Sequence, residues 1–137
     1  MTITGGCLCG AIRYAITGAL GQADNCHCSM CRKAHGAAFS SYALVAPQAW
    51  RWTAGAELCA RYRSSPGYER VFCPRCGSPL AVLHEGEIMG VTLGTVDGDP
   101  GVRPAFHMFV ASKAPWFEIT DELPCYPAYP PGFGPGG

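Results

Sequence analysis

The amino-acid sequence predicts an all-β protein, built mainly from antiparallel stacked sheets or an open barrel, with one short helix. The 137-residue chain contains 18 Gly and 12 Pro residues, and such frequent interruption disfavours a helical bundle. Between these residues, short segments with strand-like patterns recur roughly every 8–12 residues. The length suits one domain with its own core, and the nine cysteines are the unusual feature of the composition.

Strand patterns begin the chain and lead into one short helix. Alternating apolar residues within 2–17 indicate strands around a glycine-rich corner. A further short strand is expected over 22–28, where it runs into cysteine-rich sequence. Ser29 is the expected cap of a helix over about 30–35, and Gly36 is expected to close it.

Segments rich in aromatic and β-branched residues predict the remaining strands, over 39–45, 50–53, 57–63, 68–73, 80–84, 87–93 and 105–110. Turn-forming residues separate these segments, and Glu85-Gly86 is a hairpin signal. Residues 96–104, rich in Gly, Asp and Pro, are expected to form a loop. We therefore expect a single domain over 1–123, followed by a loose Pro- and Gly-rich tail over 124–137 that cannot offset its ordering entropy.

The charge balance excludes several classes of function. Ten Lys and Arg residues balance ten Asp and Glu residues, and only 15% of the chain is charged against 48% hydrophobic. This composition is not that of a disordered chain, and it argues against nucleic-acid binding through a broad basic face. No apolar run is long enough to span a bilayer, and the first residues do not resemble a signal peptide. We therefore expect a cytoplasmic protein without membrane or nucleic-acid partners; the oligomeric state stays open.

Cysteines are the most informative residues in the chain. The nine are Cys7, Cys9, Cys26, Cys28, Cys31, Cys59, Cys73, Cys76 and Cys125. Their odd number and the expected reducing compartment favour metal ligation over a disulfide framework. Cys59 lies in a strand pattern, where a small core residue is expected, and Cys125 is expected to be a free thiol.

Three groups of cysteines have metal-ligand spacing: Cys7 and Cys9; Cys26, Cys28 and Cys31; and Cys73 and Cys76. If the two outer pairs meet, four thiolates close a tetrahedral zinc site, whose role is structural. The middle group then supplies three thiolates and leaves one place for water or substrate, which is the catalytic arrangement.

Spacing alone does not decide this pairing. Cys28 and Cys31 could instead join the last pair as an ordinary zinc ribbon, with the first pair left over. One structural zinc with buried free cysteines is an equally simple interpretation. A redox C-x-x-C is a weaker one, because the chain lacks the βαβ context of such motifs.

Four ordered segments resemble the glutathione-dependent formaldehyde-activating enzyme family, which also includes centromere protein V. They are GGCLCGAIRY at 5–14, CHCSMCRK at 26–33 with GAAF at 36–39, FCPRCGSPL at 72–80, and His107 with SKAPW at 112–116. Together they extend over about residues 5–118. The tail, Cys59 and Cys125 lie outside the resemblance.

The resemblance implies an all-β fold with two Zn²⁺ ions per chain. It assigns the structural zinc to Cys7, Cys9, Cys73 and Cys76, and the second, catalytic zinc to Cys26, Cys28 and Cys31. It further implies a carbon–sulfur lyase activity that joins glutathione and formaldehyde into S-hydroxymethylglutathione. The expected partners are therefore a small thiol such as glutathione and a small aldehyde.

Further residues are candidates for contact with substrate. Glutathione carries net negative charge, so Arg32 and Lys33, next to the middle cysteines, are the leading candidates to orient it. His107 matches a position of the family and is a third candidate. His27 lies between two ligands on an extended segment, where neighbouring side chains alternate, so we expect it to face away from the metal.

Two alternatives to this enzyme remain. The chain could be a zinc-stabilised binding module without catalysis, although zero net charge weighs against DNA or microtubule binding. It could also be a related zinc enzyme that acts on a different thiol or aldehyde, since fold and metal transfer between relatives more readily than substrate does.

Overall fold

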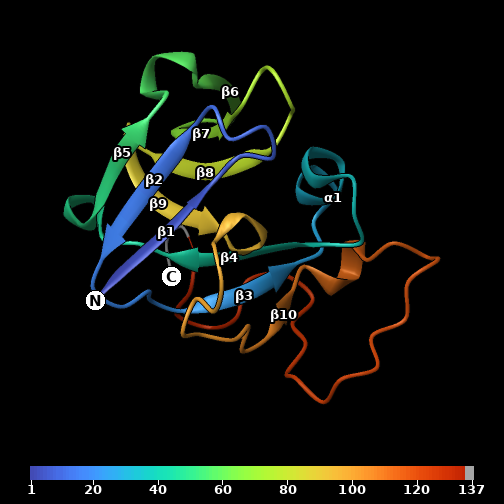
Figure 1. The fold of residues 1–137 in the computed structure, drawn as a ribbon. Helices are drawn as coiled ribbons and strands as arrows, with labels where there is room; N and C mark the ends of the chain where they lie inside the picture. Colours follow the sequence, from blue (N-terminus) through green and yellow to red (C-terminus); the bar gives the residue numbers. More distant parts are fainter. Residues whose placement is uncertain (135–137) are drawn as a thin grey trace.

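The structure, a computed structural model, describes residues 1–134 and is built mainly of β-strands (Figure 1). Three strands form a small antiparallel sheet in the order β1 (Thr2–Gly6), β2 (Arg13–Thr17) and β5 (Trp50–Ala54). As the alternation of apolar residues predicts, β1 and β2 pair around the glycine-rich corner, with Gly6 opposite Arg13. The expectation of an all-β fold is confirmed.

Seven strands form the larger sheet. Their order is β10 (His107–Met108), β3 (Ala23–Cys26), β4 (Ser40–Leu44), β9 (Glu87–Thr92), β8 (Pro79–His84), β7 (Tyr68–Phe72) and β6 (Ala60–Ser65). All neighbours are antiparallel except β10 and β3. Glu85 and Gly86 both have positive φ between β8 and β9, which is the backbone of the expected tight hairpin.

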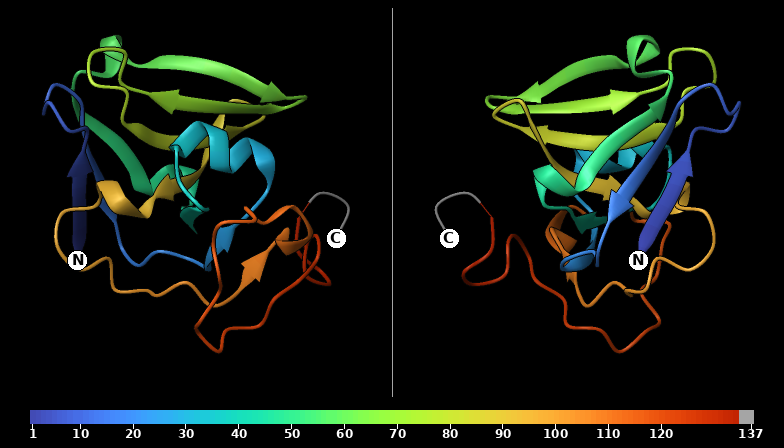
Figure 2. Two further views of the ribbon diagram at one scale, coloured as in Figure 1. Left: turned by 90° about the vertical axis from the view of Figure 1, so that its right-hand side faces the viewer. Right: turned by 60° about the vertical axis from the view of Figure 1, so that its left-hand side comes forward.

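The main core lies between the two sheets. Tyr14 and Ile16 from the small sheet pack with Leu80 and Val91 from the large one, and all four are fully buried. The ring of Tyr14 also stacks on Trp50, with centroids 4.4 Å apart. Figures 1 and 2 show the small sheet lying across one face of the large sheet. The opposite face of β3 and β4 is therefore left for the helix.

One α-helix, α1 (Ser29–His35), occurs in the described residues, and it covers that face next to β4. Gly36 closes it with φ 59°, as predicted. The cap is not Ser29, however. Cys28 occupies the N-cap position, and its sulfur accepts a hydrogen bond from the backbone N–H of Cys31. A cysteine sulfur thus replaces the hydroxyl that cap preferences predict. No helix of the described residues is long and apolar enough to cross a membrane.

Several expected strands are shorter in the structure, and for two of them the backbone shows why. Residues 57–59 are not part of β6, because a 3₁₀ turn over Ala56–Leu58 follows Gly55, whose φ is 71°. The strand expected over 105–110 is reduced to β10, because Phe109 has φ 58° and leads into another 3₁₀ turn, Val110–Ser112. The other 3₁₀ turns are Pro47–Ala49 and Leu93–Thr95.

The C-terminal segment packs beside β10, where a loose tail was expected (Figure 2). Tyr126 N–H donates to the carbonyl of His107 at 2.9 Å. Phe106 makes edge-to-face contacts with Tyr126 and Phe133. These aromatic rings supply the apolar contacts that a count of Pro and Gly does not reveal. Residues 135–137 of the expected tail lie outside the described residues, and the domain boundary after 123 stays a prediction.

Candidate metal centres

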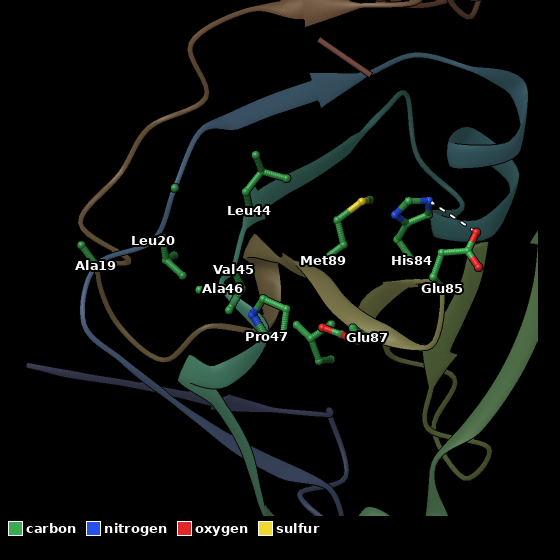
Figure 3. Close-up of a pocket in the computed structure, with 12 residues that line it drawn as sticks. Ala19, Leu20, Leu44, Val45, Ala46, Pro47, His84, Glu85, Glu87 and Met89 are labelled. Carbon is green, nitrogen blue, oxygen red and sulfur yellow. Dashed lines mark ion pairs between the residues drawn. The ribbon is translucent and has the colours of Figure 1, made fainter. Parts of the chain in front are cut away.

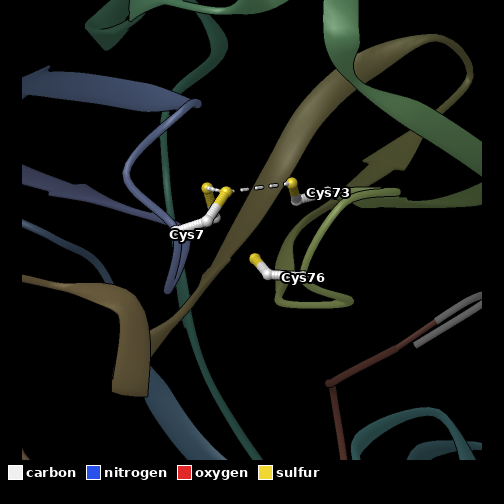
Figure 4. A group of neighbouring side chains, drawn as sticks. Cys7, Cys73 and Cys76 are labelled. Carbon is white, nitrogen blue, oxygen red and sulfur yellow. Dashed lines mark hydrogen bonds between the residues drawn. The ribbon is translucent and has the colours of Figure 1, made fainter.

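Four cysteines converge from loops of the two sheets. Cys7 and Cys9 follow β1, and Cys73 and Cys76 follow β7. Their four sulfurs all lie within 4.8 Å of one another, and we call them the four-cysteine cluster. Figure 4 shows Cys7 opposite Cys73 and Cys76. The cluster therefore joins segments more than 60 residues apart, and it joins one sheet to the other.

The two loops hold their sulfurs in similar ways. Gly10 N–H donates to the carbonyl of Cys7, and Gly77 N–H donates to the carbonyl of Cys73. Both glycines have φ near 80°, a conformation that glycine adopts without a steric penalty. Each loop therefore turns back tightly enough to aim two sulfurs at one point.

Further donors reach these sulfurs from the same loops. The backbone N–H of Ile12 donates to Cys7 Sγ at 3.3 Å. The hydroxyl of Ser78 lies 3.3 Å from Cys76 Sγ, and with nearby backbone N–H groups it lowers the pKa of Cys76 to about 5. These donors favour the thiolate, which is the form that binds metal.

The spacing of the four sulfurs fits zinc. A tetrahedral zinc with bonds of about 2.3 Å requires sulfurs about 3.8 Å apart. Cys7 Sγ lies 3.6 Å from Cys9 Sγ, which lies 3.9 Å from Cys73 Sγ. Four thiolates would occupy every place around such an ion, so this cluster suits a structural role.

The three-cysteine cluster lies at the junction of β3 and α1. Cys26 ends β3, Cys28 caps the helix, and Cys31 lies in its first turn. Their sulfurs also lie within 4.8 Å of one another. Cys26 and Cys31 are buried against Met108, whereas Cys28 is partly exposed. Within residues 1–134, no fourth His, Cys, Asp or Glu joins the group, so a tetrahedral ion would keep one place for another ligand.

Side chains of the large sheet surround this cluster. Asp24 lies opposite Tyr42 in the β3–β4 register, and Tyr42 lies opposite Thr92. Because side chains alternate along a strand, Asp24 lies on the same face of β3 as Cys26. Burial, with a smaller effect of the charge on Cys31, raises the pKa of Asp24 to about 7.

An arginine from a distant strand of the large sheet also reaches the cluster. Arg70 Nη2 donates to Cys31 Sγ at 3.7 Å, and Arg70 Nη1 donates to the hydroxyl of Tyr42 at 3.3 Å. Hydrogen bonds from Cys26 and Cys28, with a smaller contribution from Arg70, lower the pKa of Cys31. Cys31 is thus favoured as a thiolate.

A chain of hydrogen bonds leads from His27 to the surface. His27 Nε2 lies 2.8 Å from His107 Nδ1, and His107 Nε2 lies 2.9 Å from a carboxylate oxygen of Asp121. A carboxylate only accepts, so His107 donates to Asp121 and the His27 Nε2–H donates to His107. Burial lowers the pKa of His27 to about 4, and its ring packs against Phe39. His27 therefore turns away from the sulfurs, as its position predicts.

The chain is similar to known proteins in sequence and in fold. A family model described as glutathione-dependent formaldehyde-activating enzyme matches residues 2–112. The chain belongs to this family. A curated protein of Halomonas elongata, provisionally named as such an enzyme, is 31% identical over 142 residues, which cover 95% of this chain and 90% of that protein. A crystal structure of a Rhodobacter sphaeroides protein is similar with a TM-score of 0.55 and 27% identity, over 70% of this chain and 89% of that one.

The other candidate residues of this family member lie around the three-cysteine cluster in different settings. Arg32 is half-buried, and its Nε is buried without a hydrogen-bond partner in the described residues. Lys33 is exposed on α1, whereas His107 is buried and links His27 to Asp121 by hydrogen bonds. Cys59 packs at the edge of the core, and Cys125 is an exposed free thiol.

Residues that sequence patterns did not single out also meet here. Arg70 is 39 positions from Cys31, and Asp121 is 14 positions from His107. Neither has a motif that relates it to its partner, and only the pairing of strands brings them together. No sequence signal marks Arg70, because the charged Glu69 precedes it in the same strand.

A groove of about 700 Å³ opens elsewhere on the surface. Figure 3 shows its lining, which includes Leu20, Leu44 and Met89 with His84 and Glu87 at its sides. None of the seven clustered cysteines lines it within the described residues. The groove therefore lacks thiolate chemistry, and the three-cysteine cluster remains the candidate active site.

Proposed function

We propose that the chain is a zinc-dependent enzyme of the carbon–sulfur lyase type, which adds the thiol of glutathione to formaldehyde or a related small aldehyde. The observation that carries this proposal is the three-cysteine cluster, in which three sulfurs converge and no fourth protein ligand joins them among residues 1–134. Membership of the family supports glutathione and formaldehyde as the substrates. We further propose two zinc ions per chain and a cytoplasmic location, where cysteines stay reduced.

Zinc bound to Cys26, Cys28 and Cys31 would lower the pKa of an incoming thiol, so that the thiol binds as a thiolate at neutral pH. Addition then forms one bond between the thiol sulfur and the carbonyl carbon. The carbonyl oxygen gains the electron pair and takes up a proton, which balances the proton that the thiol lost. No group leaves, and no oxidant or reductant is needed.

The chain's own residues would guide the thiol to this place. The partly exposed side of Cys28 gives access, whereas Cys26 and Cys31 are covered by Met108. Arg32 and Lys33 would pair with the carboxylates of glutathione from the adjacent helix. His107 is only 1% exposed and is hydrogen-bonded to both Asp121 and His27. Its role would therefore be to hold His27, and with it the segment 26–28 that carries Cys26 and Cys28.

Turnover with isotope-labelled formaldehyde tests the proposal. Nuclear magnetic resonance resolves free formaldehyde from S-hydroxymethylglutathione, and the exchange rate between them is compared with the uncatalysed reaction. We expect wild-type protein to accelerate exchange and Cys28→Ser to leave it at the uncatalysed rate. A wild-type protein with two zinc ions and no acceleration with glutathione or other small thiols would favour the binding module.

A second experiment tests the role of the two cations. Replacing Arg32 and Lys33 together by Ala should weaken glutathione about tenfold in competition assays. Mercaptoethanol, which has no carboxylate, should bind with unchanged affinity. Equal weakening of both thiols would show that the two residues hold the helix instead of the substrate.

A further inference from the structure

Arg70 is the guanidinium that touches a sulfur of the three-cysteine cluster. Its Nη2 donates to Cys31 Sγ at 3.7 Å, and its Nη1 donates to the hydroxyl of Tyr42 at 3.3 Å. That hydroxyl also lies 2.9 Å from His35 Nε2. Arg70 comes from β7 and Tyr42 from β4, whereas Cys31 and His35 both belong to α1. Three elements therefore fix the direction of this guanidinium toward Cys31.

The charge of Arg70 has no carboxylate partner in the described residues. Arg13, Arg61 and Arg103 each form an ion pair with Asp or Glu, whereas Arg70 forms none among residues 1–134. Arg70 is also only partly exposed, so solvent does not fully replace a partner. The anionic sulfur of the cluster is thus the charge that this guanidinium offsets. Three thiolates around one divalent cation carry a net negative charge, which agrees with such a neighbour.

The resident sulfurs differ from an added thiol in their hydrogen bonds. Cys28 Sγ accepts a hydrogen bond from the backbone N–H of Cys31 at 3.3 Å, and Cys31 Sγ accepts one from Arg70. Cys26 is protected by burial instead, with 4% of its surface exposed. A donor directed at a thiolate holds its lone pair, which makes the sulfur a weaker nucleophile. A thiol that enters from solvent has none of these donors. The resident sulfurs are therefore held by donors or by burial, whereas an added sulfur is not.

We propose that Arg70 is a positioning residue that keeps Cys31 a ligand rather than a nucleophile, so that a small electrophile reacts with the added thiol and not with the protein. Without this donor, the sulfur of Cys31 would itself attack an aldehyde or alkyl halide. With iodoacetamide, a bond forms between sulfur and carbon, the carbon–iodine bond breaks, and iodide leaves. The identity of the added thiol rests on the proposed function, whereas the protection of Cys31 does not.

Site-resolved alkylation tests this inference. The zinc-loaded full chain is treated with iodoacetamide in the absence of thiols, and peptide mass spectrometry gives the rate at each cysteine. The variants are Arg70→Met and Arg70→Lys, with Arg61→Met as the matched control. Arg61 lies on the neighbouring strand β6, is exposed, and pairs with Glu69.

We expect Arg70→Met to raise the alkylation rate at Cys31 about tenfold, which is the effect of losing one charged hydrogen bond. Rates at the other clustered cysteines should change less than about twofold, because their donors remain. Arg70→Lys should restore most of the protection, and Arg61→Met should behave as wild type. An unchanged rate at Cys31 overturns the inference. So does an equal rise at all seven cysteines or loss of zinc from the cluster, because either would show that Arg70 only holds the structure.

Tyr42→Phe keeps the test decisive if Arg70→Met does not fold. This change removes the hydroxyl that orients Nη1, so we expect a rise of about threefold at Cys31 with zinc retained. No rise would overturn the inference. Turnover of glutathione and formaldehyde is measured on the same samples. If the wild type turns over but Cys31 is equally unreactive in every variant, this inference alone is wrong. If the reactivity of Cys31 depends on Arg70 but the wild type shows no turnover, the proposed function alone is wrong.

Discussion

The two cysteine clusters are built from different parts of the fold. The four-cysteine cluster is made by loops, and its sulfurs take hydrogen bonds from those same loops, such as the backbone N–H of Ile12 and the hydroxyl of Ser78. The three-cysteine cluster lies between a helix and a sheet, and its neighbours are the side chains of distant strands, such as Arg70 and Tyr42. The first cluster thus takes its hydrogen bonds from the two loops that it joins, whereas the second also takes one from a distant strand of the large sheet.

Buried polar atoms without a hydrogen-bond partner are also distributed unequally between the surroundings of the two clusters. Six buried side-chain polar atoms lack a partner in residues 1–134: Asp24 Oδ1, His27 Nδ1, Arg32 Nε, Ser40 Oγ, Trp50 Nε1 and Thr92 Oγ1. All except the Trp50 atom belong to β3, α1, β4 or β9, or to His27 in the segment between β3 and α1. A buried group without a partner costs about 1–3 kcal/mol. The fold therefore accepts instability around the three-cysteine cluster, which is typical of a site selected for function.

The largest difference is expected from removing one ligand of each cluster. Cys76→Ser should leave the chain unfolded or insoluble, with a loss of more than about 5 kcal/mol, because a structural zinc contributes folding free energy directly. Cys28→Ser should stay folded and lose only the second metal. Circular dichroism and zinc content per chain measure both results. If Cys28→Ser unfolds and Cys76→Ser does not, the roles of the two clusters are reversed.

Chelation should separate the two clusters next. Protein purified without chelator should contain two zinc ions per chain, since seven thiolates form two groups. The three-cysteine cluster has one protein ligand fewer, so it should release zinc on the order of a hundredfold more readily. Titration with a chromogenic chelator should show two steps, and only the second should coincide with unfolding. A single step, or one zinc per chain, would contradict this expectation.

The same contrast explains how far sequence reasoning could reach. Local patterns predicted the strands, the hairpin at Glu85-Gly86 and the helix end at Gly36, because each depends on residues close in the chain. Spacing alone left the pairing of the cysteines open, because a thiolate pair accepts any second pair that folding brings near. The resemblance to the family supplied the grouping that the sulfur positions now show.

The parts that could not be predicted depend on contacts between distant strands. Arg70 reaches Cys31 only because β7 and β4 belong to one sheet, and Asp121 reaches His107 only because the chain returns past β10. Cap preferences predict Ser29, because hydroxyls are common caps, but the sulfur of Cys28 takes that place. The side chains of the three-cysteine cluster thus override the usual preferences of a helix end.

A buried carboxylate gives the surroundings of the three-cysteine cluster a pH dependence near neutrality. The pKa of Asp24 is raised from 3.8 to about 7, so the folded state retains a proton that the unfolded state loses between these values. The resulting stability is complete below the unfolded pKa and is lost as the pH rises through 7. Between pH 5.5 and 8.5, wild type should therefore lose about 2 kcal/mol relative to Asp24→Asn, which does not titrate. Urea denaturation of both proteins at the two pH values measures this difference, and parallel behaviour would contradict it.

The smallest effect concerns one hydroxyl of the four-cysteine cluster. Ser78 Oγ accepts the backbone N–H of Leu8 at 2.9 Å and lies 3.3 Å from Cys76 Sγ. Ser78→Ala should cost about 1 kcal/mol of stability, because water can replace the acceptor for an exposed N–H. The pKa of Cys76, now about 5, should rise, so zinc should leave the variant at a higher pH during acid titration. Ser29→Ala is the matched control at the other cluster. Ser29 is exposed and is not the helix cap, so its removal should change neither stability nor zinc release; a larger effect at Ser29 than at Ser78 would reverse the assignment of these two hydroxyls.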